Sequence, residues 1–210
     1  MKSLAGICGA LLFTGCSTLG IRTTPEPPHD VTRRDGPIEV REYRPQVLAE
    51  TVVRADHDEA GSQAFRRLAG YIFGGNRAGR QIAMTAPVLQ KDASKSIDMT
   101  APVLQRETAE GWWMAFILPV EISLDSAPEP NDPLVELREV PGRTIATLRY
   151  GGLNSPEKME RYAVDLGRWL DKQGFRPIGP PTMASYDPPW TLWFLRRNEV
   201  QIEIERRPPT

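Results

Sequence analysis

Two well-separated segments of this chain share one sequence pattern, and this internal repeat restricts the possible folds more than any other feature. IEVREYRPQVLAETVV (Ile38–Val53) aligns without gaps on VELREVPGRTIATLRY (Val135–Tyr150). Apolar and polar residues alternate in both segments, which is typical of β-strands. Each segment is therefore predicted to form two strands joined by a tight turn, at Pro45 in the first and at Pro141–Gly142 in the second. The identical residues are Glu39, Arg41, Glu42 and Ala49 in the first segment and Glu136, Arg138, Glu139 and Ala146 in the second.

A stretch with helical periodicity follows each repeat segment. The first runs over about residues 59–73 and stops at Gly74–Gly75, and the second begins with Ser155 as N-cap and ends at Gly174. More strand-like runs follow each helix. Residues 37–206 are therefore predicted to form one α+β domain of two similar halves related by a pseudo-twofold axis. The apolar helix faces are Ala64, Phe65, Leu68, Ala69 and Ile72 in the first, and Met159, Tyr162, Ala163, Leu166 and Leu170 in the second.

The N-terminal stretch MKSLAGICGALLFTGCSTLG is a separate unit. Its apolar run, from Leu4 to about Thr14, is shorter than the ~20 residues of a membrane span and is typical of a secretion signal. The run ends in LLFTGC, which resembles the lipobox of bacterial lipoproteins, with cleavage before Cys16 and lipid on its sulfur. Ser17 follows instead of Asp, which predicts anchoring at the outer membrane, facing the periplasm of a Gram-negative cell. The alternatives are a plain signal peptide and an uncleaved anchor helix.

These features divide the chain into a signal peptide (1–15), a lipidated N-terminus with a Pro-rich tether (16–36) and a folded domain (37–206). Cys8 would leave with the signal peptide and Cys16 would carry lipid, so the folded domain has no cysteine for a disulfide or a metal site. The formal net charge of −1 gives no basic excess for binding nucleic acid. We find no P-loop, G-x-S-x-G elbow or H-E-x-x-H motif, and predict that the protein is not an enzyme.

The chain also contains one short phrase twice. IAMTAPVLQ (Ile82–Gln90) and IDMTAPVLQ (Ile97–Gln105) differ at a single position. The polar linker between them predicts two adjacent antiparallel strands with Met84 and Met99 on the same side. Methionine is flexible and polarizable, so this side could contact a flat apolar ligand. The alternative is that both side chains simply pack in the core.

Several motifs together resemble the SOUL/heme-binding protein family, in its bacterial form. They are IAMTAPV after YIFGGN, the run YDPPWTLWFLRRNEVQIEI (Tyr186–Ile204), IEVREY, and VELREVPGRTIATLRYGG. The resemblance covers about Pro37 to Glu205. It implies a distorted β-barrel of two βαββ halves flanked by two helices, similar to the gyrase-inhibitor-like effector-binding fold. It also implies that heme or a related tetrapyrrole binds in an apolar groove beside the first helix.

The sequence departs from this family at the expected iron ligand. Some animal members have a histidine in the first strand, where this chain has Glu42, and a carboxylate is a poor substitute for imidazole on heme iron. His29 lies in the predicted tether, and His57 lies in a polar stretch predicted to be a solvated loop. The remaining candidates are Tyr71, Tyr186, Met84 and Met99 for the metal, Arg77, Arg80, Arg196 and Arg197 for the propionates, and Trp190 and Trp193 for stacking on the ring.

The sequence thus predicts a heme- or tetrapyrrole-binding envelope lipoprotein that serves transport, buffering or delivery. Two alternatives stay open. The domain is either an envelope scaffold whose groove is filled by side chains or by a protein partner, or a binder of another small hydrophobic ligand.

Overall fold

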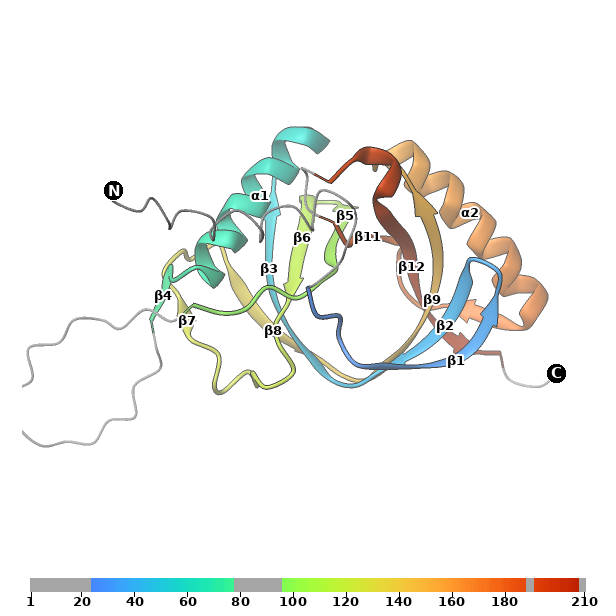
Figure 1. The fold of residues 1–210 in the computed structure, drawn as a ribbon, viewed down its shortest axis with the longest axis horizontal. Coiled ribbons are helices and arrows are strands. Elements are labelled where there is room, and N and C mark those ends of the chain that lie inside the picture. Colours follow the sequence, from blue (N-terminus) through green and yellow to red (C-terminus); the bar gives the residue numbers. More distant parts are fainter. Residues whose placement is uncertain (1–23, 78–95, 188–190, 208–210) are drawn as a thin grey trace, which may run out of the picture.

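A computed structural model describes residues 24–77, 96–187 and 191–207, which form an antiparallel sheet with two helices (Figure 1). No helix in this part of the chain is long and apolar enough to cross a membrane. The elements are β1 (His29–Asp35), β2 (Ile38–Tyr43), β3 (Gln46–Val53), α1 (His57–Ile72), β4 (Asn76–Arg77), β5 (Val103–Thr108), β6 (Gly111–Ile117), β7 (Glu129–Pro130), β8 (Glu136–Val140), β9 (Arg143–Gly151), α2 (Pro156–Gln173), β10 (Phe175–Pro177), β11 (Thr182–Ser185), the short 3-10 helix η1 (Trp193–Leu195) and β12 (Arg197–Arg206).

The two repeat segments pair with each other, so the predicted hairpins are wrong. β2 pairs with β9 up to Tyr43↔Arg143, and β3 pairs with β8 from Gln46↔Val140 onward, in one unbroken register. A two-residue hairpin turn needs a positive φ at its first central residue. Neither Arg44 before Pro45 nor Pro141 before Gly142 suits that position, because proline fixes φ near −65° and arginine rarely adopts a positive value. Each segment therefore continues as an extended chain and pairs with the other copy, instead of folding back on itself.

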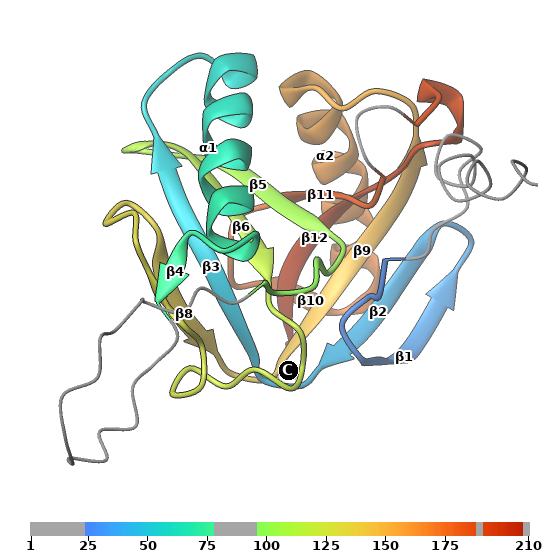
Figure 2. The same ribbon diagram turned by 60° about the vertical axis from the view of Figure 1, so that its left-hand side comes forward.

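The strand order reflects the pseudo-twofold relation between the halves. It runs β1-β2-β9-β12-β11-β5-β6-β3-β8, with β10 added beside β12. The central pairings of one half have counterparts in the other: β3–β6 corresponds to β9–β12, β5–β6 to β11–β12, and β2–β9 to β8–β3. The expected closed barrel is not formed by the described strands, since the order has two ends, β1 and β8. The result is a strongly bent sheet (Figures 1 and 2).

Helix α1 covers one face of β3 and β6. It starts at His57, slightly earlier than predicted, because the side chain of Asp56 accepts a hydrogen bond from the backbone N–H of Glu59 at 2.9 Å. His57 belongs to the helix and not to a loop, and its ring packs edge-on against Trp112 at 4.7 Å while 23% of the side chain stays exposed. Burial of each large apolar side chain on this face contributes about 1.5–3 kcal/mol. The buried helix residues are Ala60, Ala64, Leu68, Tyr71 and Ile72.

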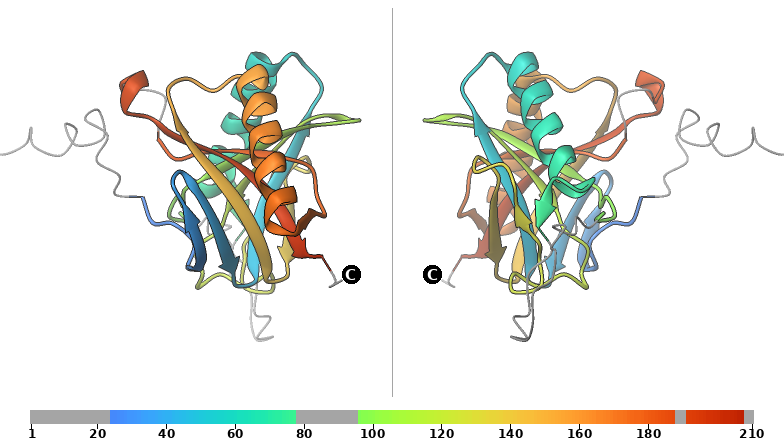
Figure 3. Two further views of the ribbon diagram at one scale, coloured as in Figure 1. Left: turned by 90° about the vertical axis from the view of Figure 1, so that its right-hand side faces the viewer. Right: turned by 90° about the vertical axis from the view of Figure 1, so that its left-hand side faces the viewer.

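Helix α2 covers β9 and β12, and its predicted limits are confirmed. Ser155 accepts from the N–H of Lys158, Pro156 opens the first turn, and Gly174 closes the helix with φ 74°. The predicted apolar face packs against Ala146 and Val200 of the sheet. Figure 3 shows the two helices from both sides of the molecule.

The inner face of the sheet, turned away from both helices, is apolar in one half and charged in the other. Trp112 and Trp113 face opposite sides of β6, as predicted, and both are buried. Trp113 belongs to an apolar cluster that also includes Leu48, Ala115 and Tyr186. The hydroxyl of Tyr186 donates to the carboxylate of Glu199 at 2.6 Å, which joins this cluster to the charged half.

Glu199 is the centre of a buried charge network. Its side chain is inaccessible to solvent and accepts from the guanidinium of Arg41 at 2.8 and 2.9 Å and from Arg197 at 2.7 Å. Burial alone would raise the pKa of Glu199, but its bonds with Arg41 and the charges of Arg41 and Arg197 outweigh burial and lower the pKa to about 2. Burial and the nearby carboxylate raise the pKa of Tyr186.

The N-terminal edge of the sheet extends further than predicted. His29–Asp35, expected in the tether, form β1 and pair with β2 from His29↔Tyr43 to Asp35↔Ile38. The second copy of the duplicated phrase also differs from the prediction. Its strand, β5, begins only at Val103, because Pro102 has no N–H to donate to a ladder. The first copy of the phrase, Ile82–Gln90, lies outside the described residues.

We predict that Glu199→Gln lowers the free energy of unfolding at pH 7 by about 3–5 kcal/mol, because it removes the buried carboxylate that binds both Arg41 and Arg197 and leaves Glu39 as the remaining partner of Arg41. The pKa of Glu199 is lowered in the folded state, so its contribution is complete above pH about 4.5 and is lost as the pH falls toward about 2. The difference between wild type and variant in urea unfolding should therefore shrink as the pH falls from 5 to 3. A difference independent of pH would contradict this assignment.

Candidate functional site

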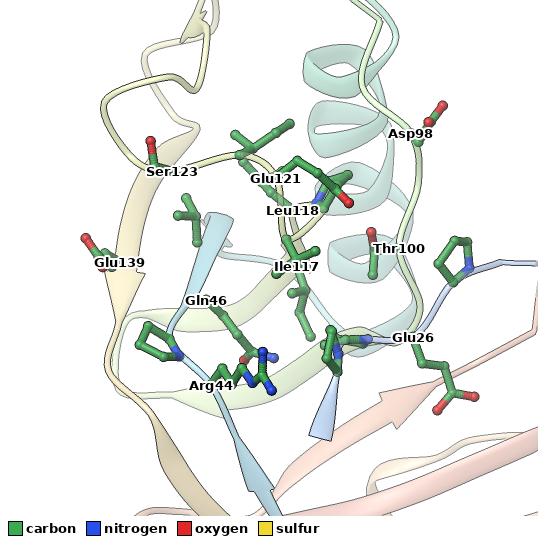
Figure 4. A pocket seen from close by; sticks show the side chains of 18 residues that line it. Glu26, Arg44, Gln46, Asp98, Thr100, Ile117, Leu118, Glu121, Ser123 and Glu139 are labelled. Atoms are coloured by element: carbon green, nitrogen blue, oxygen red, sulfur yellow. The ribbon is translucent and has the colours of Figure 1, made fainter. Parts of the chain in front are cut away.

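A cavity of about 580 Å³ opens beside the end of β6, and Figure 4 shows its lining side chains. One wall is the segment Thr24–Pro28, here called the strap, which precedes β1. The opposite wall is the loop after β6, Leu118–Ser123, and the floor lies at the junction of β2 and β3. We call this cavity the strap pocket. Its volume lies within the range of about 300–1,000 Å³ that is usual for small-molecule sites.

Polar contacts with distant parts of the chain hold the strap in place. The carbonyl oxygen of Pro25 accepts a hydrogen bond from the N–H of Ala101 at 2.9 Å. The carboxylate of Glu26 forms an ion pair with Arg197 at 2.7 Å, so the strap is bound to the charge network around Glu199. The strap is therefore part of the folded structure, although the sequence predicted a tether here.

The walls of the strap pocket are largely apolar and offer few hydrogen-bond donors. Val47, Ile117 and Leu118 are buried residues of its lining. Prolines contribute rigid apolar surface and have no backbone N–H. Such walls favour an apolar ligand, since a polar one would lose its bonds with water. The wall prolines are Pro25, Pro27, Pro28, Pro45 and Pro119.

Arg44 and Gln46 supply the polar groups at the floor of the pocket, where β2 passes into β3 (Figure 4). Arg44 is exposed. The side-chain carbonyl of Gln46 accepts from Arg143 at 3.4 Å, while its buried amide nitrogen, Nε2, has no hydrogen-bond partner. A buried donor without an acceptor costs about 1–3 kcal/mol, so a ligand acceptor that met this amide after a rotation of the Gln46 side chain would be stabilised.

Carboxylates also surround the pocket. Asp98, Glu121 and Glu139 line it and are exposed, and none has an ion-pair partner among the described residues. Figure 4 shows Asp98 and Glu139 on opposite sides of the pocket, away from Arg44 and Gln46. The pocket therefore has one end with donors and a rim with acceptors.

The structure does not bring the sequence-predicted site residues together. Tyr71 is buried in α1, its hydroxyl donates to the carbonyl oxygen of Pro128 at 3.0 Å, and burial raises its pKa to about 12. Met99 packs against the core cluster under α1. Arg77 lies exposed in β4, and Trp193 lies on η1 with 60% of its surface exposed. None of these lines the strap pocket.

The side chains of Arg197 and Tyr186 are bound to other residues of the protein. Arg197 bonds with both Glu199 and Glu26, and its guanidinium lies 3.9 Å from the centre of the Tyr186 ring. Arg196 donates to the carbonyl oxygen of Thr191 at 2.9 Å. Cys16, Arg80, Met84 and Trp190 lie outside the described residues, so their predicted roles stay predictions, as does a groove beside α1.

The lining of the strap pocket suits an apolar ligand but offers no usual ligand for heme iron. Its volume and apolar walls suit an apolar body, and Arg44 and Gln46 suit an acidic substituent. Its lining residues include no histidine, cysteine, methionine or tyrosine to coordinate iron. Within the described ranges, no group of three or more His, Cys, Asp or Glu side chains could hold a metal ion.

Little in the sequence indicates this site. Pro25, Pro27 and Pro28 are predicted to lie in a tether, because Pro-rich composition is typical of linkers. Arg44 and Gln46 belong to the repeat, whose pattern predicts a turn and a strand there. One usable signal was present: Gln46 follows the proline at which the two halves cross, and the second half has Arg143 at the equivalent position.

The chain is similar to several known proteins. Mouse heme-binding protein 2 is 25% identical over 186 residues, which is 84% of this chain and 86% of the mouse protein. Among solved structures, the EcmrR C-terminal domain has a TM-score of 0.56 at 10% identity, covering 80% of this chain and 97% of that domain. A hydrolase from Listeria innocua has a TM-score of 0.54 at 9% identity, covering 87% and 94%. These two likenesses concern the fold alone.

The family comparison is more extensive. The model of the SOUL heme-binding protein family matches residues 24–203, from the strap to β12. The matched region contains both repeat segments, both helices and every residue that lines the strap pocket. The chain therefore belongs to the SOUL heme-binding protein family.

Proposed function

We propose that this protein binds heme or a related tetrapyrrole in the strap pocket, and that it does so at the bacterial cell envelope. The observation that carries the proposal is the pocket itself, a cavity of about 580 Å³ with apolar and proline walls, in a chain of the SOUL family. Its family is one of binding proteins, which agrees with the absence of a catalytic motif in the sequence.

Burial of the ring would supply most of the binding free energy. Removal of apolar surface from water contributes about 25 cal/mol per Å², and a tetrapyrrole presents two large flat faces. The prolines of the strap and the buried side chains of Ile117 and Leu118 would cover these faces. Iron, when present, would supply the redox and ligand-exchange chemistry of heme, and this chain's residues would bind, orient and shield the ring.

Rigid walls also favour selective binding. Proline loses little conformational freedom when a ligand binds, since its φ is already fixed. The strap is held at Pro25 and Glu26, so the wall is largely formed before the ligand arrives. A preformed wall reduces the entropy that binding would otherwise cost.

The location at the envelope rests on the lipobox-like LLFTGC. We propose that lipid on Cys16 anchors the domain to the outer membrane, where it would transport, buffer or deliver the tetrapyrrole. The interval between Cys16 and Thr24, where the described structure begins, would place the pocket close to that membrane.

We predict that Val120→Trp weakens hemin binding at least tenfold, because the larger side chain would fill part of the pocket that Val120 lines. Val120 is 62% exposed, so the substitution leaves the core intact. Leu134→Trp is the matched control, since Leu134 is 58% exposed and lies outside the lining. Titration in the Soret region should give saturable one-to-one binding for wild type and control. Equal affinity in all three proteins would place the ligand elsewhere, and no saturable binding by wild type would refute the proposal.

Cys16→Ser should abolish the incorporation of lipid into the protein, because lipid is attached through the cysteine sulfur. Labelling of growing cells with palmitate and fractionation of their membranes measure this directly. Wild type should incorporate label and the variant should not. Equal labelling would contradict lipidation at Cys16, while an unlabelled wild type still in the membrane would indicate an uncleaved anchor helix.

A further inference from the structure

Among the described residues that line the strap pocket, Gln46 has the one buried side-chain polar atom without a hydrogen-bond partner. Its carbonyl oxygen accepts from Arg143, and this contact determines how the amide is oriented. Its nitrogen, Nε2, is shielded from solvent and has no acceptor among the described residues. Because an amide N–H donates and cannot accept, the group that completes this site must carry an acceptor oxygen or nitrogen.

Arg143 lies directly behind Gln46 and adds positive charge at this end of the pocket. Its nearest carboxylate, that of Glu203, is 3.9 Å away, at the limit of an ion pair. Its Nε is also buried without a partner. Burial, only partly offset by Glu203, lowers the pKa of Arg143, which reflects a cation with too little compensating negative charge.

Arg44 places a second guanidinium on the same floor. It is exposed and has no ion-pair partner among the residues that the structure describes. Gln46 and Arg44 are separated by Pro45 alone, and Figure 4 shows both side chains at the base of the pocket. A guanidinium and an amide N–H next to each other match the two oxygens of a carboxylate.

The acidic rim determines which end of a ligand can lie here. Asp98, Glu121 and Glu139 would repel a carboxylate at the mouth, and Glu26 is neutralised by Arg197. Glu203 faces Arg143 from β12 and reduces, without cancelling, the positive charge at the floor. The favourable position for a ligand carboxylate is therefore the floor, with the apolar body against the proline walls.

We propose that Arg44 and Gln46 bind the carboxylate of an apolar ligand at the floor of the strap pocket. The inference rests on the proposed use of this pocket as a ligand site, and it adds the substrate class: an apolar body with an acidic substituent, such as the propionate of a porphyrin or the head group of a fatty acid. Iron plays no part in this recognition.

The test compares acids with their uncharged esters. The full-length Cys16→Ser protein is titrated, by ligand fluorescence, with metal-free protoporphyrin IX and its dimethyl ester, and with a fluorescent long-chain fatty acid and its methyl ester. Metal-free porphyrin removes any contribution from iron ligation. We expect at least one acid to bind about tenfold more tightly than its ester, as charge-assisted hydrogen bonds to a partly exposed cation allow.

Variants locate the carboxylate. Arg44→Met keeps the length of the side chain and removes the charge. Gln46→Glu keeps the acceptor toward Arg143 and replaces the free donor by a second acceptor, so the fold is retained while the ligand carboxylate is repelled. Each should weaken binding of the acid about five- to tenfold and leave the ester unchanged. Arg149→Met, at an exposed arginine of β9 outside the pocket, is the matched control and should change neither.

The outcomes separate this inference from the proposed function. If neither acid binds more tightly than its ester, or if the variants leave acid binding unchanged, the inference is overturned, and tetrapyrrole binding stands as long as the porphyrins bind. If porphyrins do not bind but the fatty acid binds in preference to its ester and depends on Arg44 and Gln46, the inference is supported and tetrapyrrole binding fails. If neither acid binds, both are overturned.

Discussion

The antiparallel pairing between the two copies of the repeat is the constraint on which the rest of the structure depends. Because β2–β9 and β3–β8 share one register, each copy serves both halves of the sheet. The pairing places α1 over one half and α2 over the other, and it turns the opposite faces of the strands inward. A slip of one residue would exchange the apolar helix-facing side chains for charged ones such as Glu39 and Arg41.

The crossing of the two copies also generates the site. Arg44 and Pro45 lie between β2 and β3 and belong to neither strand, so the side chain of Arg44 is not fixed by regular cross-strand packing. Gly142 approaches closely on the facing copy, where a Cβ would lie 3.1 Å from the carbonyl oxygen of Tyr43. Gln46 and Arg143 thus come together where the two copies cross. The residues at this crossing therefore determine the strand pairing and also supply polar groups to the pocket.

Local features could be predicted from the sequence and long-range ones could not. The helix caps at Ser155 and Gly174 and the apolar helix faces depend on neighbouring residues, and they are confirmed. The strand segments were also predicted, but their partners were wrong, because alternation specifies a strand without specifying what it pairs with. The strap was missed for a related reason. Proline-rich composition indicates a segment without regular structure, and such a segment is a tether or a rigid wall according to contacts that only the folded chain has.

Arginine illustrates why candidate site residues were assigned incompletely. Arg197 was a candidate for propionate binding, yet it neutralises Glu199 and holds Glu26, so its donors are already occupied. Arg44 resembles an ordinary turn residue in the sequence, yet it is the cation that faces the pocket. The two roles are connected, because Arg197 joins the strap to the buried network and so fixes the wall opposite the floor where Arg44 lies. A ligand that displaces the strap would have to break the Glu26–Arg197 ion pair. Opening the site therefore costs the free energy of this pair.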